Sequence, residues 1–156
     1  MNNLLFLIAF NIVIVAVSGN WLQSCLDRHN LYRRRHGKPL MTLDSKAISH
    51  ASKRARELSS RCAFDHSGNS GSGFGENLAG GNADCARDVD MWYGEIKQYN
   101  PRNPRFSPST GHYTQLIWRS STRLGCATAS HCRYRHVTVC SYYPPGNYAG
   151  RFNENV

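Results

Sequence analysis

The six cysteines are the feature of this sequence that most constrains its fold. Their number is even, and all of them follow an apolar N-terminal segment. This pattern indicates an exported protein held together by disulfide bonds. A cysteine metal site is the alternative, but no two cysteines have the C-x-x-C spacing typical of such sites. The six cysteines are Cys25, Cys62, Cys85, Cys126, Cys132 and Cys140.

The apolar segment has the pattern of a secretory signal peptide. Residues 4–17 read LLFLIAFNIVIVAV and are followed by the small residues Ser18 and Gly19. This run is shorter than the roughly 20 apolar residues that a transmembrane helix needs. We therefore expect a signal peptide over residues 1–19, an extracellular location, and one monomeric domain over residues 20–156. An uncleaved membrane anchor is the alternative, because no Lys or Arg precedes the apolar run.

The chain is strongly basic. Its 156 residues suit a single hydrophobic core, and 19 Lys and Arg against 10 Asp and Glu give a net charge of +9. Such a charge favours anionic partners. The densest basic run comprises Arg33, Arg34, Arg35, His36 and Lys38. We expect a solvated helix end there, with adhesion to an anionic membrane or glycan as the alternative. Specific nucleic-acid binding is not expected, because no aromatic side chain lies among these arginines.

Hydrophobic periodicity places the helices before the main strands. Amphipathic spacing predicts helices over residues 21–36, 45–62 and 84–99, and in the second helix Lys53, Arg54 and Arg56 fall outside the apolar stripe. A short extended segment is expected at 74–81, a proline-rich loop at 100–111, and two strands near 124–129 and 136–143. This order predicts an α+β fold in which helices cover a small antiparallel sheet.

Two histidines and two carboxylates are the best candidates for a functional site. Glu95 follows Trp92 by three residues on an expected helix, so it lies beside the apolar stripe and needs a partner. Imidazoles are natural partners, and two histidines with carboxylates form a plausible ligand set for Zn²⁺ or another divalent cation. Ordinary structural hydrogen bonds are the alternative. The four residues are His66, Glu76, Glu95 and His112.

Two longer segments resemble a known family. Residues 111–127, GHYTQLIWRSSTRLGCA, and residues 136–152, HVTVCSYYPPGNYAGRF, are similar to the signature segments of the CAP superfamily of cysteine-rich secretory, antigen 5 and pathogenesis-related class 1 proteins. The segments HNLYRRRHG, GENLA and DMWYGEIKQYN match in the same order. The resemblance implies a three-layer α-β-α sandwich, stabilised by disulfides, with a small central antiparallel sheet. It also implies an open cleft holding the four residues above, in which His66 and His112 bind a divalent metal.

The resemblance further implies a function and a set of disulfides. Family members bind sterols and fatty acids or act in host defence, and the lipid site would involve the loop at 103–110 through Pro104 and Phe106, helped by Trp118. Six cysteines can pair in many ways. The spacing of Cys126 and Cys140 suits a staple between neighbouring strands. The similarity to plant members implies that Cys62 pairs with Cys132, which leaves Cys25 with Cys85.

Other functions remain open at this point. A metal-dependent hydrolase would use His66, His112 and a bound cation to activate water, with Glu76 or Glu95 as the base. A metal-free ribonuclease is a variant of that idea. A secreted effector, venom component or allergen would act through protein contacts. We expect a binding protein rather than an enzyme.

Overall fold

The computed structural model describes residues 19–81 and 83–156. The expected signal peptide lies outside the described residues, apart from Gly19, which begins helix α1. Among the described residues, none of the helices combines the length and the apolar character of a membrane span.

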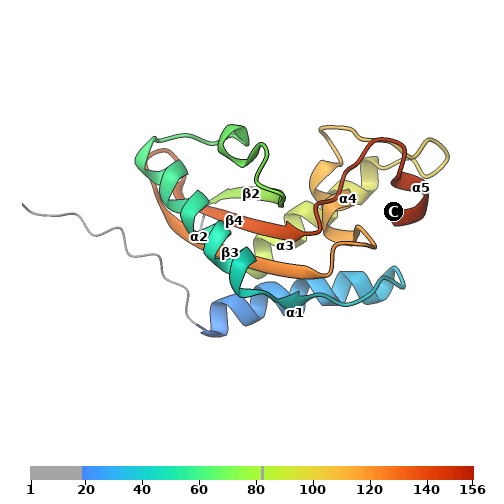
Figure 1. The fold of residues 1–156 in the computed structure, drawn as a ribbon, viewed down its shortest axis with the longest axis horizontal. Helices are drawn as coiled ribbons and strands as arrows, with labels where there is room; N and C mark the ends of the chain where they lie inside the picture. Colours follow the sequence, from blue (N-terminus) through green and yellow to red (C-terminus); the bar gives the residue numbers. More distant parts are fainter. Residues whose placement is uncertain (1–18, 82) are drawn as a thin grey trace, which may run out of the picture.

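Three long antiparallel strands and one short parallel strand make the sheet (Figure 1). The strand order is β1-β3-β4-β2, and β4 pairs antiparallel with both β3 and β2. The two-residue β1 pairs parallel with β3, an edge that the sequence analysis did not include. The strands are β1 (Thr42–Leu43), β2 (Gly75–Gly81), β3 (Arg123–His131) and β4 (Arg135–Tyr143).

Helices cover both faces of this sheet, as expected for a three-layer α-β-α sandwich. The α-helices are α1 (Gly19–Arg35), α2 (Ser45–Ser60), α3 (Cys85–Gly94), α4 (Gly111–Ile117) and α5 (Phe152–Asn155). Two short 3₁₀ helices are η1 (Ser67–Asn69) and η2 (Glu95–Gln98). Successive strand residues point to opposite faces, so Ala127 packs with α2 whereas its neighbour Cys126 packs with α1, α3 and α4.

Helix α2 packs very closely on strand β3. A Cβ atom added at Gly125 would overlap the backbone of Ala47 and Ile48 in the first turn of α2. The side chain of Asp44 caps this turn by accepting a hydrogen bond from the Ala47 amide at 2.9 Å. Glycine at 125 therefore allows the capped end of α2 to lie directly on the strand.

Three disulfides link elements of the sandwich to one another. Cys25–Cys85 connects α1 to α3, Cys62–Cys132 connects the end of the α2 segment to the turn between β3 and β4, and Cys126–Cys140 links the paired strands β3 and β4. These are the same pairs that the strand spacing and the family resemblance indicated. None of the six cysteines is free.

The basic run at the end of α1 is only partly a surface feature. Arg33 is fully buried, and its guanidinium donates hydrogen bonds to the carbonyl oxygens of Leu116, Trp118, Pro39 and Arg119. Burial lowers the pKa of Arg33 to about 10, so it remains charged at neutral pH. The expectation of a fully solvated helix end was therefore wrong for Arg33, which ties α1 to the segment after α4.

Candidate functional site

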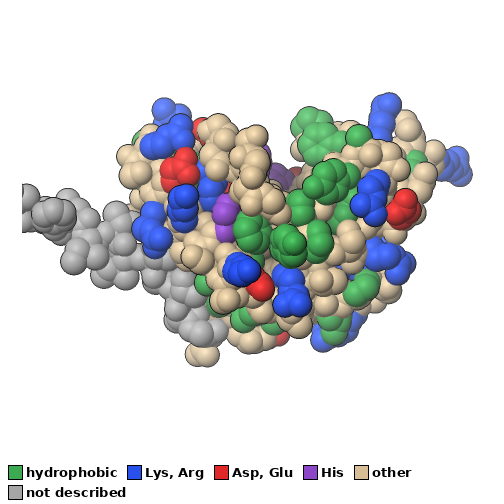
Figure 2. Space-filling model, in the orientation of Figure 1, with side chains coloured by type: hydrophobic (Ala, Val, Ile, Leu, Met, Phe, Trp, Pro, Cys, Tyr) green, Lys and Arg blue, Asp and Glu red, His purple; other side chains and the backbone are tan. Residues whose placement is uncertain are grey.

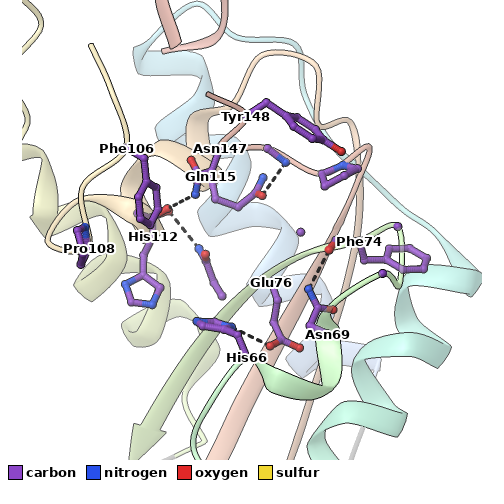
Figure 3. Close-up of a pocket in the computed structure, with 17 residues that line it drawn as sticks. His66, Asn69, Phe74, Glu76, Phe106, Pro108, His112, Gln115, Asn147 and Tyr148 are labelled. Atoms are coloured by element: carbon purple, nitrogen blue, oxygen red, sulfur yellow. Dashed lines mark hydrogen bonds and ion pairs between the residues drawn. The ribbon is translucent and has the colours of Figure 1, made fainter. Parts of the chain in front are cut away.

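An open cleft of about 760 Å³ lies between the start of β2 and α4. Figure 2 shows the surface hollowed there, with histidine side chains in the hollow. His66, Glu76 and His112 line the cleft, and the aromatic side chains of Phe106 and Tyr148 line it further out (Figure 3). The cleft therefore combines titratable groups with apolar rings.

One half of the site is a buried ion pair capped by an exposed imidazole. The Nδ1 atom of His66 donates a hydrogen bond to Glu76 at 2.9 Å, and Arg54 donates two more to the same carboxylate, at 2.8 and 3.2 Å. The side chains of Arg54 and Glu76 are each only 1% exposed, whereas that of His66 is 57% exposed. The imidazole is thus the part of this chain of contacts that faces the cleft.

Arg54 was expected on the outer face of its helix, and that expectation was wrong. It leaves α2 toward the sheet because the buried Glu76 needs a cation, and it also bonds to Glu57 at 2.8 Å. Burial alone would raise the pKa of Glu76, but the hydrogen bonds from His66 and Arg54 outweigh it, so the pKa lies below its ordinary value. Glu76 is consequently a stable carboxylate at neutral pH.

The other half of the site pairs Glu95 with His112. The expected helix over 84–99 changes from α to 3₁₀ geometry at Glu95, which directs this side chain to the start of α4. Its carboxylate accepts hydrogen bonds from the backbone amides of His112 and Tyr113 at 3.0 and 3.1 Å and from His112 Nδ1 at 2.6 Å. Glu95 therefore fixes both the backbone and the imidazole of His112.

Core contacts also hold His112 in place. Its ring stacks on the buried Trp92 with centroids 6.0 Å apart, and its carbonyl oxygen accepts a hydrogen bond from Asn77 at 3.1 Å. As expected from the sequence, residues 113–118 are buried and support this position.

Both imidazoles present the same atom to the cleft. Each Nδ1 donates to a carboxylate, which leaves the lone pair of Nε2 as the acceptor, and neither Nε2 atom has a hydrogen-bond partner in the described parts of the chain. A carboxylate behind each imidazole is the usual arrangement around metal-binding histidines. The two Nε2 atoms are therefore the candidate ligands for a divalent cation, and each glutamate holds its imidazole from behind.

Potential metal ligands that lie close together form a different group of residues, whose ligand atoms are not free. Among residues 19–81 and 83–156, the only set of three donor atoms within 4.8 Å of one another belongs to Cys25, Cys85 and Cys126. All three sulfurs are in disulfides, so none is a thiolate.

The two expected lipid-loop residues lie at different cavities. Phe106 is 53% exposed and lines the histidine cleft, whereas Pro104 lines a separate cavity of about 540 Å³ together with Tyr99, Tyr113 and Phe152. Trp118 is fully buried against Phe152 and cannot contact a ligand, contrary to its expected supporting role.

The wall of the cleft opposite β2 depends on residues that the sequence analysis missed. Gln115 accepts a hydrogen bond from the Gly146 amide at 2.9 Å, and Asn147 bonds to Gly111 and Thr114 in α4. The only sequence signal for these contacts was their place in the two family-like segments. These amides fasten the segment after β4 to α4.

Comparison with known proteins identifies the family. The model of the cysteine-rich secretory protein family, CAP, matches residues 26–142. The chain belongs to the CAP family. A pathogenesis-related protein of PR-1 type from Sambucus nigra is 35% identical over 153 residues, covering 95% of this CAP chain and 90% of the relative.

A second relative and a solved structure are also similar to this CAP protein. "Repressed by EFG1 protein 1" from Candida albicans is 39% identical over 129 residues, which cover 82% of this chain but only 47% of that relative. A crystal structure of NaASP2 with Zn²⁺ has a TM-score of 0.68 and 24% identity, covering 86% of this chain and 87% of that one. The structural likeness shows that the CAP fold is shared.

Proposed function

We propose that this CAP protein is a secreted binding protein whose cleft takes up a divalent cation through the Nε2 atoms of His66 and His112. The observation that carries the proposal is the orientation of both imidazoles by Glu76 and Glu95, which leaves both Nε2 lone pairs unpaired. Imidazole nitrogens are common Zn²⁺ ligands, and water would complete the coordination. The solved NaASP2 structure with Zn²⁺ agrees with this choice.

Secretion is part of the same proposal. The apolar pattern at residues 4–17 and the three disulfides both suit an oxidising, extracellular compartment. Relatives named as pathogenesis-related proteins support a role in host defence or in contact between organisms.

Calorimetry with Zn²⁺ after removal of bound metal tests the cation site. His66→Ala and His112→Ala should each abolish measurable binding, and Glu95→Gln should weaken it about 10- to 100-fold because the imidazole loses its orienting carboxylate. His136→Ala is the matched control, because His136 lies on β4 and does not line the cleft. Zn²⁺ binding that survives both cleft substitutions would overturn the proposal.

A second candidate function is the binding of a sterol or fatty acid. The exposed ring of Phe106 and the aromatic cavity next to Pro104 favour it. Binding of a fluorescent sterol should fall in Phe106→Ala if the cleft is the site, and in Pro104→Ala if the separate cavity is. Unchanged sterol binding in both variants would exclude this loop as the sterol-binding site.

The contacts of the two glutamates argue against the hydrolase alternative, in which one of them would act as the base. Glu76 accepts three hydrogen bonds from His66 and Arg54, and Glu95 accepts three from residues 112 and 113. Each carboxylate is therefore occupied as an acceptor and poorly placed to take a proton from water. A protease and nuclease screen of the Zn²⁺-loaded protein would reveal any turnover.

A further inference from the structure

A basic and aromatic surface lies where α2 ends and β3 turns into β4. It comprises Phe64, Tyr134, Arg61, Arg133 and Arg135, and we call it the arginine–tyrosine surface. The Cys62–Cys132 disulfide brings its two segments together, because Arg61 precedes one cysteine and Arg133 follows the other. All five residues are exposed, and Figure 2 shows Lys and Arg side chains gathered over the α2 end of the molecule. None of the five lines the histidine cleft.

Tyr134 is an exposed ring with a fixed position. It is 41% exposed, yet it stacks on His131 with centroids 5.2 Å apart and an interplanar angle of 28°. Phe64 packs against it at 4.8 Å, and a Cβ atom added at Gly80 would lie 2.8 Å from its Cγ atom. The ring thus rests directly on the backbone of β2. Because it is already immobilised, it would lose little conformational entropy on contact with a planar ligand.

The arginines beside this ring are available to a partner. Arg133 and Arg135 flank Tyr134 in the chain, and neither forms an ion pair within the described ranges. Arg61 is 51% exposed in its side chain and shares Glu57 with Arg54. The other nearby carboxylate, Asp65, accepts hydrogen bonds from Ser67. The positive charge of the surface is therefore only partly compensated.

The backbone conformation of the turn does not explain why residue 135 is an arginine. Arg135 has a φ of 65°, a left-handed conformation that favours glycine or asparagine. An arginine at this position costs about 1 kcal/mol of backbone strain. A side chain that serves only the turn would be smaller, so the charge of Arg135 is better explained by a partner.

We propose that the arginine–tyrosine surface binds an acidic polysaccharide that carries sulfate or uronate groups. The face of a sugar ring would pack on Tyr134, and the guanidinium groups would form paired hydrogen bonds with sulfate or carboxylate oxygens. A glycan is favoured over a nucleic acid because a disulfide forms the base of the surface, and disulfides persist where extracellular acidic glycans occur. This inference concerns a surface outside the cleft and does not depend on the cation site.

The basic run at the end of α1 provides the comparison. Arg33 is buried there, and Arg35 lies over the ring of Tyr32 at 5.2 Å, so Arg34 and Arg35 are its exposed arginines. In Figure 1 this end of α1 and the turn between β3 and β4 lie toward opposite ends of the long axis. The two clusters can therefore be tested separately at equal change of net charge.

Titration with a size-defined heparin oligosaccharide tests the proposal. The double variant Arg133→Gln/Arg135→Gln should lose about 100-fold in affinity, since it removes a charge-assisted hydrogen bond at each of two arginines and each bond is worth roughly a factor of ten. The matched variant Arg34→Gln/Arg35→Gln should bind nearly as tightly as the unaltered protein. Equal losses in the two variants would mean that heparin senses net charge alone, and the proposed surface would be abandoned.

Substitutions of Tyr134 distinguish binding of a glycan from binding of other polyanions. Tyr134→Leu should weaken heparin binding but leave binding of inorganic polyphosphate unchanged, and Tyr134→Phe should retain heparin binding. Circular dichroism of each variant should match the unaltered protein. The Tm of the arginine variants should also match, because those side chains are exposed, whereas Tyr134→Leu is expected to lower the Tm somewhat because it removes packing on His131 and Phe64. Tighter, Tyr134-dependent binding of a single-stranded oligonucleotide or of phosphatidylserine vesicles than of heparin would overturn the glycan assignment.

Discussion

The Nε2 atom of His29 and the hydroxyl of Tyr142 lie 2.8 Å apart in the core and join α1 to β4. His29 Nδ1 donates to the Cys25 carbonyl oxygen at 2.7 Å, so Nε2 must accept the Tyr142 proton. Tyr142 in turn accepts from Asn77, the same amide that donates to the His112 carbonyl. A continuous set of hydrogen bonds therefore runs from the core to the cleft and requires His29 to be neutral.

Acid should destabilise the protein through His29. Burial lowers its pKa from 6.5 to about 4, so the unfolded chain takes up a proton at higher pH than the folded protein does. The stability that neutral His29 provides is complete above pH 6.5 and is lost as the pH falls toward 4, a change on the order of 3 kcal/mol. Urea unfolding between pH 4 and 8 measures it, with His29→Gln for comparison. If both proteins show the same pH slope, His29 is not the group responsible.

Arg54→Met should strongly destabilise the fold. It leaves the buried carboxylate of Glu76 without its cation, at a cost of about 3–5 kcal/mol. Arg56→Met is the matched control, because Arg56 is exposed on the same helix and should change stability by less than about 0.5 kcal/mol. The free energy of unfolding in urea measures both effects. Recovery of part of the loss in Arg54→Met/Glu76→Leu would assign the cost to the unpaired charge, whereas no recovery would argue against this cause.

Gly125→Ala should prevent α2 from packing on β3. The added methyl group meets backbone atoms of residues 47 and 48, which cannot move aside as a flexible side chain could. We expect a loss of folded protein, measured by yield and thermal unfolding. Gly94→Ala is the control, because nothing lies within 4 Å of a Cβ atom there and its φ is helical. Equal stability of the two variants would contradict the close approach of helix and strand.

Gln115→Leu should loosen the wall of the cleft. Gln115 is 2% exposed, and its loss leaves the Gly146 amide without an acceptor, which costs about 1–3 kcal/mol. Amide hydrogen exchange should accelerate at residues 146–148, whereas Gln98→Leu at an exposed position should not change it. Unchanged exchange in Gln115→Leu would mean that other contacts hold this segment.

The local patterns of the sequence predicted α1, α2, α3 and the long strands, but they did not predict α4 or α5 as helices. The Asp44 cap, the apolar stripe of α2 and the hairpin of Cys126 and Cys140 depend on neighbours close in the chain. β1 was missed because its two residues pair with residues 123 and 124, and no local pattern reveals such a short, distant pairing.

The side-chain errors concerned the buried arginines, Trp118 and the two loop residues. Helical spacing placed Arg54 outside, but its partner Glu76 lies 22 residues later, and Arg33 bonds to carbonyls more than 80 residues away. Charge patterns along one helix cannot reveal such partners. The proximity of Pro104 and Phe106 in sequence likewise concealed that they face different cavities.

The Cys62–Cys132 disulfide gives two distinct regions a common anchor. His66, one of the two cleft histidines, follows Cys62 by four residues. The basic turn that carries Tyr134 follows directly after Cys132. A substitution that displaces this covalent joint would disturb the cleft and the arginine–tyrosine surface together. Sequence change near this disulfide at one surface is therefore constrained by the needs of the other. Variants near the disulfide should be assayed for binding both at the cleft and at the arginine–tyrosine surface.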